Sequence, residues 1–281
     1  MNLYIIVEGE QTELSVYPAW LSILAPQMQR IDDATKVSSN NYYLFSAHGI
    51  PSIFTHVANA IIDVNAINAS SDSKYDYIIV CLDTEEESRQ YIEERIQEKI
   101  DAYGVKLNDA KLVVFEQKVC METWFLGNRK VFKQNPQGAE FIRFVHHYNV
   151  KQDDPEYMDT IDEDRYNKAQ FHVRYLKRML AERNMLYDKN NTAAVCSKDY
   201  LHHAFVLFFI TLMPFYILQN FKYFPTLCRC KIQFCFYTIR IIYYTEKAKA
   251  SSIFSIRFVS YFYKILSNEC AHRKIEQAGS S

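Results

Sequence analysis

Glycine is scarce in this chain, and the scarcity is uneven. Only 6 of 281 residues are glycine, which is about a third of typical usage. None occurs from residue 139 to residue 278. That stretch lacks the residue that most easily supplies turns and helix stops. The scarcity is our first indication that the two ends of the chain differ in kind.

The net charge of the whole chain is close to zero, but it is the sum of an acidic part and a basic part. The chain has 32 Lys+Arg and 33 Asp+Glu, a formal net charge of −1, with 49% hydrophobic and 23% charged residues. These values exclude a disordered chain, a polytopic membrane protein and a nucleic-acid binder recognisable by net charge. However, residues 1–199 hold 22 basic and 30 acidic side chains, whereas residues 200–281 hold 10 and 3. An acidic body is therefore followed by a basic tail.

Recognisable cysteine motifs and a leader are absent as well. The seven cysteines form no CxxC pair, and the Cys and His spacings match no common zinc pattern. The chain opens directly on a strand-like apolar run at residues 3–7, without a basic region and a longer apolar stretch, so no signal peptide is expected. We therefore expect a cytoplasmic protein with free thiols.

The tail differs from the body in composition. Between residues 200 and 267 there is one acidic residue, Glu246, and 19 residues are Phe or Tyr. Residues 204–218 are almost wholly apolar and approach the ~20 residues that a membrane helix needs. Membrane contact is therefore expected only through residues 201–221. Three interpretations stay open: a membrane-associated extension, a hydrophobic subdomain, or non-native sequence produced by a frameshift or read-through.

The body alternates strand-like and helical patterns. Residues 77–82 are continuously apolar, which is typical of a parallel strand buried on both faces. We expect an α/β fold, an open and mostly parallel sheet with flanking helices, over residues 1–135. A helical extension would follow at 136–199, and the atypical tail at 200–281. The expected strands are 3–7, 42–45, 75–82 and 112–115, and the expected helices are 12–24, 52–64, 85–102, 121–132, 139–147 and 167–183.

Four carboxylates follow these strands. Glu8 comes directly after the first strand, Asp83 and Glu85 follow the strongest one, and Glu122 lies just beyond the fourth. In open parallel sheets the chemistry lies at the carboxyl ends of the strands, so we expect the side chains of Glu8, Asp83 and Glu85 to meet. Clustered carboxylates repel one another unless a cation neutralises them, and oxygen ligands suit Mg²⁺ or Mn²⁺. The pattern predicts a metal site for phosphoryl transfer.

The competing interpretation of these acids is a solvated surface. Residues 83–87 read Asp-Thr-Glu-Glu-Glu, and acids are common in the first turn of a helix, where they complement the helix dipole. On the same argument Glu10 and Glu13 are expected to be acids of a helix N-terminus rather than metal ligands.

Basic candidates for nucleic-acid contact are few. Arg129 and Lys130 follow the last of the four carboxylates and are candidates for phosphate contact. Arg174, Lys177 and Arg178 belong to the one basic stripe of the acidic body. Because basic side chains on one helix are typical of contact with a nucleic-acid backbone, the stripe is a candidate interface. A solvated helix face is the alternative.

Three segments resemble the TOPRIM (topoisomerase–primase) fold. Residues 5–13, Ile-Ile-Val-Glu-Gly-Glu-Gln-Thr-Glu, resemble its first motif, in which a Glu follows the first strand. Residues 78–85 stand where that fold carries Asp-x-Asp after a strand. Residues 120–128 look like the E-x-W-x-L segment of small stand-alone TOPRIM proteins, which include OLD-type and RloB-like nucleases of prokaryotic defence cassettes. The resemblance covers about residues 1–130.

The resemblance implies roles for the strand-end carboxylates. Glu8 would be a general acid/base or a metal ligand, and Asp83 and Glu85 would bind Mg²⁺. Glu122 would be a further carboxylate on the metal or on the side of the scissile phosphate. Catalysis is thus expected of Glu8, Asp83 and Glu122, and metal binding of Glu8, Asp83 and Glu85. The departure from the family pattern is Glu85, which stands where the second Asp is expected and reaches one methylene further.

These expectations define a function and its alternatives. The resemblance implies a Mg²⁺-dependent nuclease that acts on DNA or RNA phosphodiesters in anti-phage defence. One alternative is a non-catalytic TOPRIM module that regulates or assembles with an ATPase or with copies of itself. Another is a membrane-tethered defence effector that uses the tail.

Overall fold

A computed structural model of the protein describes residues 1–85 and 87–201. All of these residues belong to one compact unit. No helix in this described part is long and apolar enough to cross a membrane. Residues 202–281 lie outside the described part, and so do the three interpretations of the tail and nearly all of the stretch considered for membrane contact.

The described residues contain one five-stranded sheet in the order β2-β3-β1-β4-β5. Every neighbouring pair of strands is parallel, so the expected open α/β sheet is confirmed and is parallel throughout. All five residues of the central strand β1 are buried, as its continuous apolar run predicts. The strands are β1 (Leu3–Val7), β2 (Gln29–Ile31), β3 (Asn41–Ser46), β4 (Tyr77–Asp83) and β5 (Lys111–Gln117).

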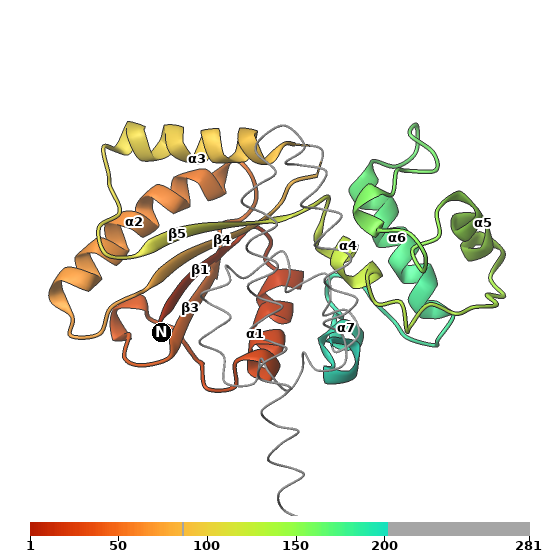
Figure 1. Ribbon diagram of the computed structural model, residues 1–281, viewed down its shortest axis with the longest axis horizontal. Helices are drawn as coiled ribbons and strands as arrows, with labels where there is room; N and C mark the ends of the chain where they lie inside the picture. Colours follow the sequence, from red (N-terminus) through yellow and green to blue (C-terminus); the bar gives the residue numbers. More distant parts are fainter. Residues whose placement is uncertain (86, 202–281) are drawn as a thin grey trace, which may run out of the picture. The chain divides into compact units, whose positions relative to one another are not determined.

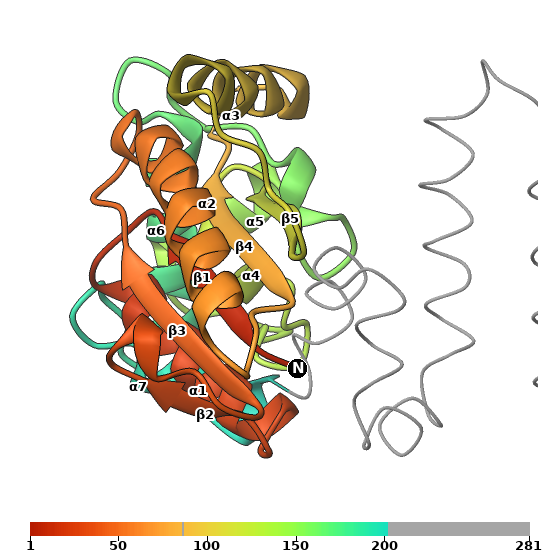
Figure 2. The ribbon, with the colours of Figure 1, turned by 90° about the vertical axis from the view of Figure 1, so that its left-hand side faces the viewer.

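Helices cover both faces of this sheet. Figure 1 shows α2 (Ser52–Ser70) and α3 (Arg89–Tyr103) on one face, and α1 (Thr12–Leu24) with the short α7 (Ala193–Cys196) on the other. The end-on view in Figure 2 shows the same division. The chain leaves β1 toward β3 on one side and later returns to β4 on the other. The covering helix changes face between these two crossings, which makes a topological switch point at the centre of the sheet.

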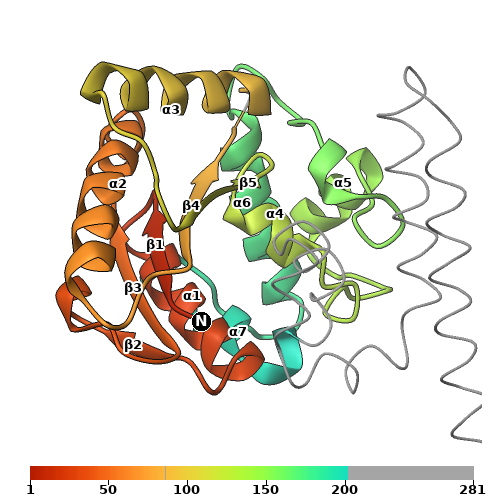
Figure 3. The same cartoon turned by 60° about the vertical axis from the view of Figure 1, so that its left-hand side comes forward.

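A helical layer lies beyond the carboxyl ends of the strands. It contains α4 (Met121–Leu126), α5 (Ala139–His147), α6 (Lys168–Ala181) and the 3₁₀ turn η2 (Pro155–Tyr157). Helix α6 packs against both α4 and α5, and η2 packs against α4 (Figure 3). Aromatic rings fill this layer, with Phe144 and Tyr175 both in contact with Phe171. The layer therefore has a core of its own beside the sheet edge.

The helix predicted over residues 85–102 begins later than its acidic run suggested. The Ser88 hydroxyl accepts a hydrogen bond from the Tyr91 N–H at 3.1 Å and caps α3, which starts at Arg89. Glu85 stands before the cap with φ 48°, in the left-handed region. The view of Glu85 as an acid of the first helical turn is therefore wrong, because the Ser88 hydroxyl caps α3 and Glu85 lies three residues before that cap.

The helix predicted over residues 121–132 is too long. It ends at Leu126, and the Asn128 side-chain oxygen then accepts hydrogen bonds from the Lys130 and Val131 N–H groups. This local bonding competes with helix continuation. Strand β2 and helix α7 were not predicted at all, because three and four residues leave too little pattern to read.

The end of the body folds back across the molecule. The Trp20 indole N–H donates to the Val195 carbonyl at 3.0 Å, and the Tyr200 hydroxyl donates to the Phe125 carbonyl at 2.7 Å. Tyr200 and Leu201, the first two residues of the predicted tail, are buried. The boundaries proposed at 135 and 199 stay predictions, but these two residues pack with the body.

Candidate active site

Parallel pairing brings the first two candidate carboxylates together. Val7 lies opposite Cys81 in the register of β1 and β4, so Glu8 and Asp83 leave the sheet side by side. The Asp83 N–H donates to Glu8 Oε2 at 3.0 Å, and the Glu8 N–H donates to the Cys81 carbonyl at 3.1 Å. The sheet therefore places Glu8 against the end of β4, as the strand-end argument expects.

Glu122 reaches this place from the helical layer, and a chain of hydrogen bonds fixes its helix. The Cys120 N–H donates to Thr123 Oγ1 at 3.3 Å, and Thr123 Oγ1 lies 2.8 Å from His172 Nδ1. His172 Nε2 lies 2.8 Å from the Met158 carbonyl, which only accepts. The proton is thus on Nε2, and Nδ1 accepts from Thr123. Burial lowers the pKa of His172 to about 4, so the ring is neutral. Glu122 itself is only 4% exposed.

Two residues that the sequence did not single out complete the surroundings of Glu122. The Tyr187 hydroxyl donates to Glu122 Oε1 at 2.8 Å, and burial raises the pKa of Tyr187 far above its usual range. Lys189, two residues further on, is exposed. Its positive charge lowers the pKa of three carboxylates, Glu8, Glu13 and Asp83. No local pattern marks these residues, because they reach the site from a loop 65 residues beyond Glu122.

Glu13 also belongs to the site, although it was expected only as an acid of a helix N-terminus. It does stand in the first turn of α1, but its side chain is buried and accepts a hydrogen bond from the Gly9 N–H at 3.1 Å. A Cβ atom at position 9 would collide with this carboxylate, so the close approach requires glycine. In the sequence, the glycine directly after the strand-end Glu8 was the one signal that another group approaches the backbone closely there. We call Glu8, Glu13, Asp83 and Glu122 the carboxylate cluster.

Burial and mutual repulsion disfavour charge in the cluster. Burial raises the pKa of Glu8 to about 7 and that of Asp83 well above its usual range. The neighbouring carboxylates raise both pKa values further, while Lys189 lowers them. In the described residues, Lys189 is the one basic side chain among the main influences on the pKa of these groups. Such an arrangement holds protons at neutral pH unless a cation compensates the charge.

Two buried oxygens at the end of the sheet have no hydrogen-bond donor within the described part of the chain. They are Asp83 Oδ1 and Oε1 of Gln117, which is the register partner of Asp83 on β5. The Gln117 amide nitrogen donates to the Tyr17 hydroxyl at 2.7 Å, which leaves the amide oxygen as the free end. Buried acceptors without a partner are rare in native proteins, and a bound ion or water commonly explains them.

The chemistry of the cluster fits one kind of metal ion. Within residues 1–85 and 87–201, no three His, Cys, Asp or Glu side chains are grouped so that they alone could hold an ion. That excludes a closed zinc-type cage from this part of the chain. Mg²⁺ is usually bound by one or two carboxylates and completes its shell with water and substrate phosphate. Strand-end carboxylates with a free buried oxygen therefore fit Mg²⁺, and by the same argument Mn²⁺.

Backbone strain is concentrated at the same edge. His48, Glu85 and Val119 have φ values of 60°, 48° and 68°, and each is the second residue after the end of β3, β4 and β5, respectively. The Glu85 N–H donates to the Val119 carbonyl at 2.9 Å and joins two of these turns. A β-branched residue with positive φ is an outlier. Strained residues of this kind cost about 1–3 kcal/mol each and gather at functional sites.

The remaining predicted residues lie around the cluster or away from it. Glu85 is exposed, and its charge raises the pKa of Glu8, so it borders the cluster. Arg129 and Lys130 are exposed beyond the end of α4. Lys177 is exposed on α6, where Arg174 and Arg178 both form ion pairs with Glu140. One carboxylate therefore compensates about one of the three positive charges of the predicted basic stripe.

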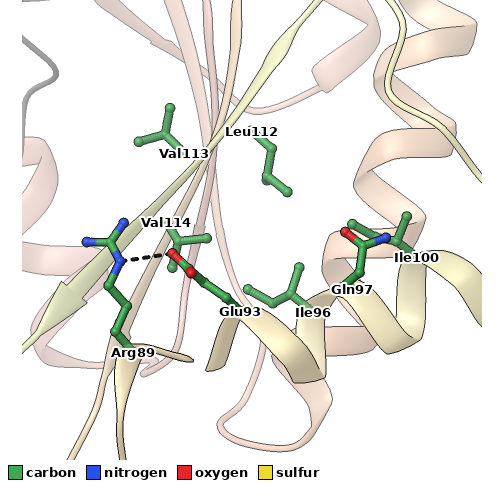
Figure 4. A pocket seen from close by; sticks show the side chains of 8 residues that line it. All are labelled: Arg89, Glu93, Ile96, Gln97, Ile100, Leu112, Val113 and Val114. Carbon is green, nitrogen blue, oxygen red and sulfur yellow. Dashed lines mark hydrogen bonds and ion pairs between the residues drawn. The ribbon is translucent and has the colours of Figure 1, made fainter. Parts of the chain in front are cut away.

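A separate groove lies between α3 and β5. It has a volume of about 290 Å³, and its lining combines the aliphatic side chains of both elements with the ion pair of Arg89 and Glu93 (Figure 4). No member of the carboxylate cluster lines it. The candidate active site is therefore the strand-end cluster and not this groove.

Similarity to known proteins gives no guide to the function of this chain. No family model, no curated protein and no solved structure matches it. Its function must therefore be argued from the residues and their geometry.

Proposed function

We propose that the protein is a Mg²⁺-dependent nuclease of TOPRIM type that cleaves nucleic-acid phosphodiesters. One observation carries the proposal: four carboxylates from three separate chain segments meet at the carboxyl ends of β1 and β4, where Asp83 Oδ1 is buried without a donor. The TOPRIM resemblance and the defence role that it implies are part of the proposal. Strain in three neighbouring turns supports a functional origin of the arrangement.

The residues divide into ligands and groups that act on the substrate. Asp83 and Glu8 would hold the ion, and Glu85 borders them from its exposed turn. A bound Mg²⁺ would polarise the scissile phosphate and lower the pKa of an attacking water. Gln117 Oε1 offers a neutral oxygen beside these carboxylates.

The other side chains handle protons and charge. The Tyr187 hydroxyl donates a hydrogen bond to Glu122 Oε1 and so fixes that oxygen. The other carboxylate oxygen would accept a hydrogen bond from the attacking water or from a protonated phosphate oxygen. Because the pKa of the ligand Glu8 is about 7 without an ion, Glu8 would release a proton near neutral pH when Mg²⁺ binds. The exposed ammonium group of Lys189 would stabilise the negative charge that develops on the phosphate.

The test is cleavage by the full-length chain. Labelled DNA and RNA oligonucleotides are incubated with Mg²⁺, Mn²⁺ or EDTA, and products are resolved on denaturing gels. We expect metal-dependent cleavage that falls about 10²- to 10⁴-fold in Glu8→Gln, Asp83→Asn and Glu122→Gln. Glu10→Gln is the matched control, because Glu10 is exposed and pairs with His48 outside the cluster. Undiminished cleavage in both Glu8→Gln and Asp83→Asn would disprove the site.

A second measurement separates the nuclease from the regulatory alternative. Titration calorimetry with Mn²⁺ reports metal binding whether or not cleavage occurs. Binding that is lost in Asp83→Asn, without cleavage of any oligonucleotide, would favour the non-catalytic TOPRIM module that partners an ATPase or a second copy. The membrane-tethered alternative rests on residues outside the described part of the chain.

A further inference from the structure

A lysine and an exposed tyrosine form a pair that the proposed chemistry does not use. The Lys118 ammonium nitrogen lies 3.9 Å from the centre of the Tyr157 ring, which is the distance of a cation–π contact. Tyr157 is nevertheless 67% exposed, one of the largest exposed fractions among the large hydrophobic residues of the described part. The lysine lies over the ring, and most of the tyrosine nevertheless stays exposed to solvent.

The tyrosine is held on a rigid support. In η2 the Asp154 carboxylate accepts a hydrogen bond from the Glu156 N–H at 3.0 Å, and the Asp154 carbonyl accepts from the Tyr157 N–H at 3.1 Å. Pro155 is buried within the same turn. His172 bonds the Met158 carbonyl directly after it. An aromatic side chain on such a turn is preorganised, so little conformational entropy is lost when a ligand stacks on it.

The pair belongs to two segments that adjoin the carboxylate cluster. Lys118 directly follows Gln117, the last residue of β5 and the register partner of Asp83. Turn η2 packs on α4, the helix that carries Glu122. A strand of nucleic acid whose phosphate lies at the cluster would reach both residues by extending along the end of β5 and over η2.

The charge on Lys118 is only partly compensated. Among the described residues, Lys118 forms an ion pair with Glu156, with an N–O distance of 3.8 Å. Burial and the charge of Asp154 raise the pKa of Glu156 to about 7, so much of its population is neutral at neutral pH. The ammonium group thus keeps positive charge for a phosphate while it lies against the ring.

We propose that Lys118 and Tyr157 form a subsite for an unpaired nucleotide, whose base stacks on the exposed ring of Tyr157 and whose phosphate contacts Lys118. The inference rests on the proposed function and narrows its substrate to single-stranded nucleic acid or frayed ends. Aromatic rings bind unpaired bases by stacking, whereas bases within a duplex keep their faces covered. The same geometry disfavours an intact duplex as the preferred ligand.

Binding measurements test the subsite apart from cleavage. Fluorescence anisotropy is recorded for the full-length chain with a labelled single-stranded oligonucleotide and with its duplex, with Ca²⁺ in place of Mg²⁺. We expect the single strand to bind more tightly. Tyr157→Ala should weaken that binding at least about fivefold, while Tyr157→Phe retains it. Lys118→Gln should weaken it and flatten the salt dependence by about 0.7 in log–log slope.

Matched control residues lie near the amino ends of β4 and β5, at the opposite end of the strands from the cluster. Tyr103 is an exposed tyrosine at the end of α3, and Lys74 is an exposed lysine that pairs with Asp109. Tyr103→Ala and Lys74→Gln should bind as the unchanged protein does. Equal binding by Tyr157→Ala and the unchanged protein, a preference for duplex, or no binding of either oligonucleotide would each overturn the subsite. Tyr157-dependent binding without any cleavage would keep the subsite and disprove the nuclease, so the two failures are distinguishable.

Discussion

At the scale of single residues, the cluster couples folding to protons. Glu8 has a pKa of about 7 in the folded protein, against about 4.5 for an unperturbed glutamate, and burial and neighbouring charges also raise the pKa of Glu13 and Asp83. At a pH between the unfolded and the folded pKa, a carboxyl group whose folded pKa is raised is protonated in the folded protein and ionised in the unfolded chain. The free energy of unfolding therefore falls as the pH rises from the unfolded pKa to the folded one.

This coupling predicts an unusual pH dependence. In EDTA we expect Glu8 alone to remove about 3 kcal/mol of stability between pH 4.5 and pH 8, while the lowered pKa of His172 acts in the opposite direction below pH 6.5. Thermal unfolding followed by circular dichroism across this pH range measures the loss. Glu8→Gln should flatten the curve, and Mg²⁺ should restore stability mainly at the alkaline end. A metal-free protein that grows steadily more stable toward pH 8 would contradict the raised pKa values.

The sequence could identify only part of this site. Glu8, Asp83 and Glu122 were predicted because each follows a strand whose apolar run is plain, and parallel strands end at one edge. Tyr187 and Lys189 follow no strand, so only the folded chain brings them to Glu122 and its neighbours. The burial of Glu13 depends on packing and leaves no periodic signal.

At the scale of elements, long apolar runs were predictable, whereas helix caps, short elements and hydrogen-bonded turns were not. Strand β4 and helix α1 stand where their patterns placed them. Strand β2, Gln-Arg-Ile, is mostly exposed and has no apolar run to mark it. The turn between β4 and α3 was read as helix, because the acidic sequence does not reveal that Glu85 adopts a positive φ.

A substitution in that turn can distinguish the backbone strain at Glu85 from a role of its side chain in metal binding. Asparagine tolerates the left-handed region better than glutamate does. We expect Glu85→Asn to leave the free energy of unfolding unchanged or to raise it by about 0.5–1 kcal/mol, as measured by urea denaturation. If Glu85 contributes to the metal site, the same variant binds Mn²⁺ more weakly by calorimetry. Unchanged Mn²⁺ affinity would remove Glu85 from the proposed ligands and leave Asp83 and Glu8.

At the scale of the whole molecule, the body is closed by its last residues. The segment that carries Tyr187 continues to Thr192, whose hydroxyl lies 2.7 Å from the Ser15 hydroxyl on α1. It ends with Tyr200, whose ring is buried and whose carbonyl accepts from the Asn128 side chain at 3.0 Å. The amino-acid composition changes after residue 199, but the buried residues of the body continue at least to Tyr200.

Two truncations test where the folded body ends. We expect a chain that ends after Leu201 to unfold cooperatively and to keep the metal-dependent activity, because its last residues retain their contacts. A chain that ends after Asp199 loses the buried Tyr200 ring and its hydrogen bonds, which should cost about 3 kcal/mol or more. Urea denaturation of both chains gives the comparison. Equal stability of the two would show that Tyr200 is not part of the body's core.

The segment from Tyr187 to Tyr200 is the last part of the body to be synthesised, so it also determines when the site can be completed on the ribosome. The strand ends that carry Glu8 and Asp83 are complete once Gln117 has been made. The hydroxyl that fixes Glu122 arrives 65 residues after Glu122 itself. Until then a nascent chain exposes repelling carboxylates without their tyrosine or their lysine. Translation thus delays the finished site until almost the whole body has emerged.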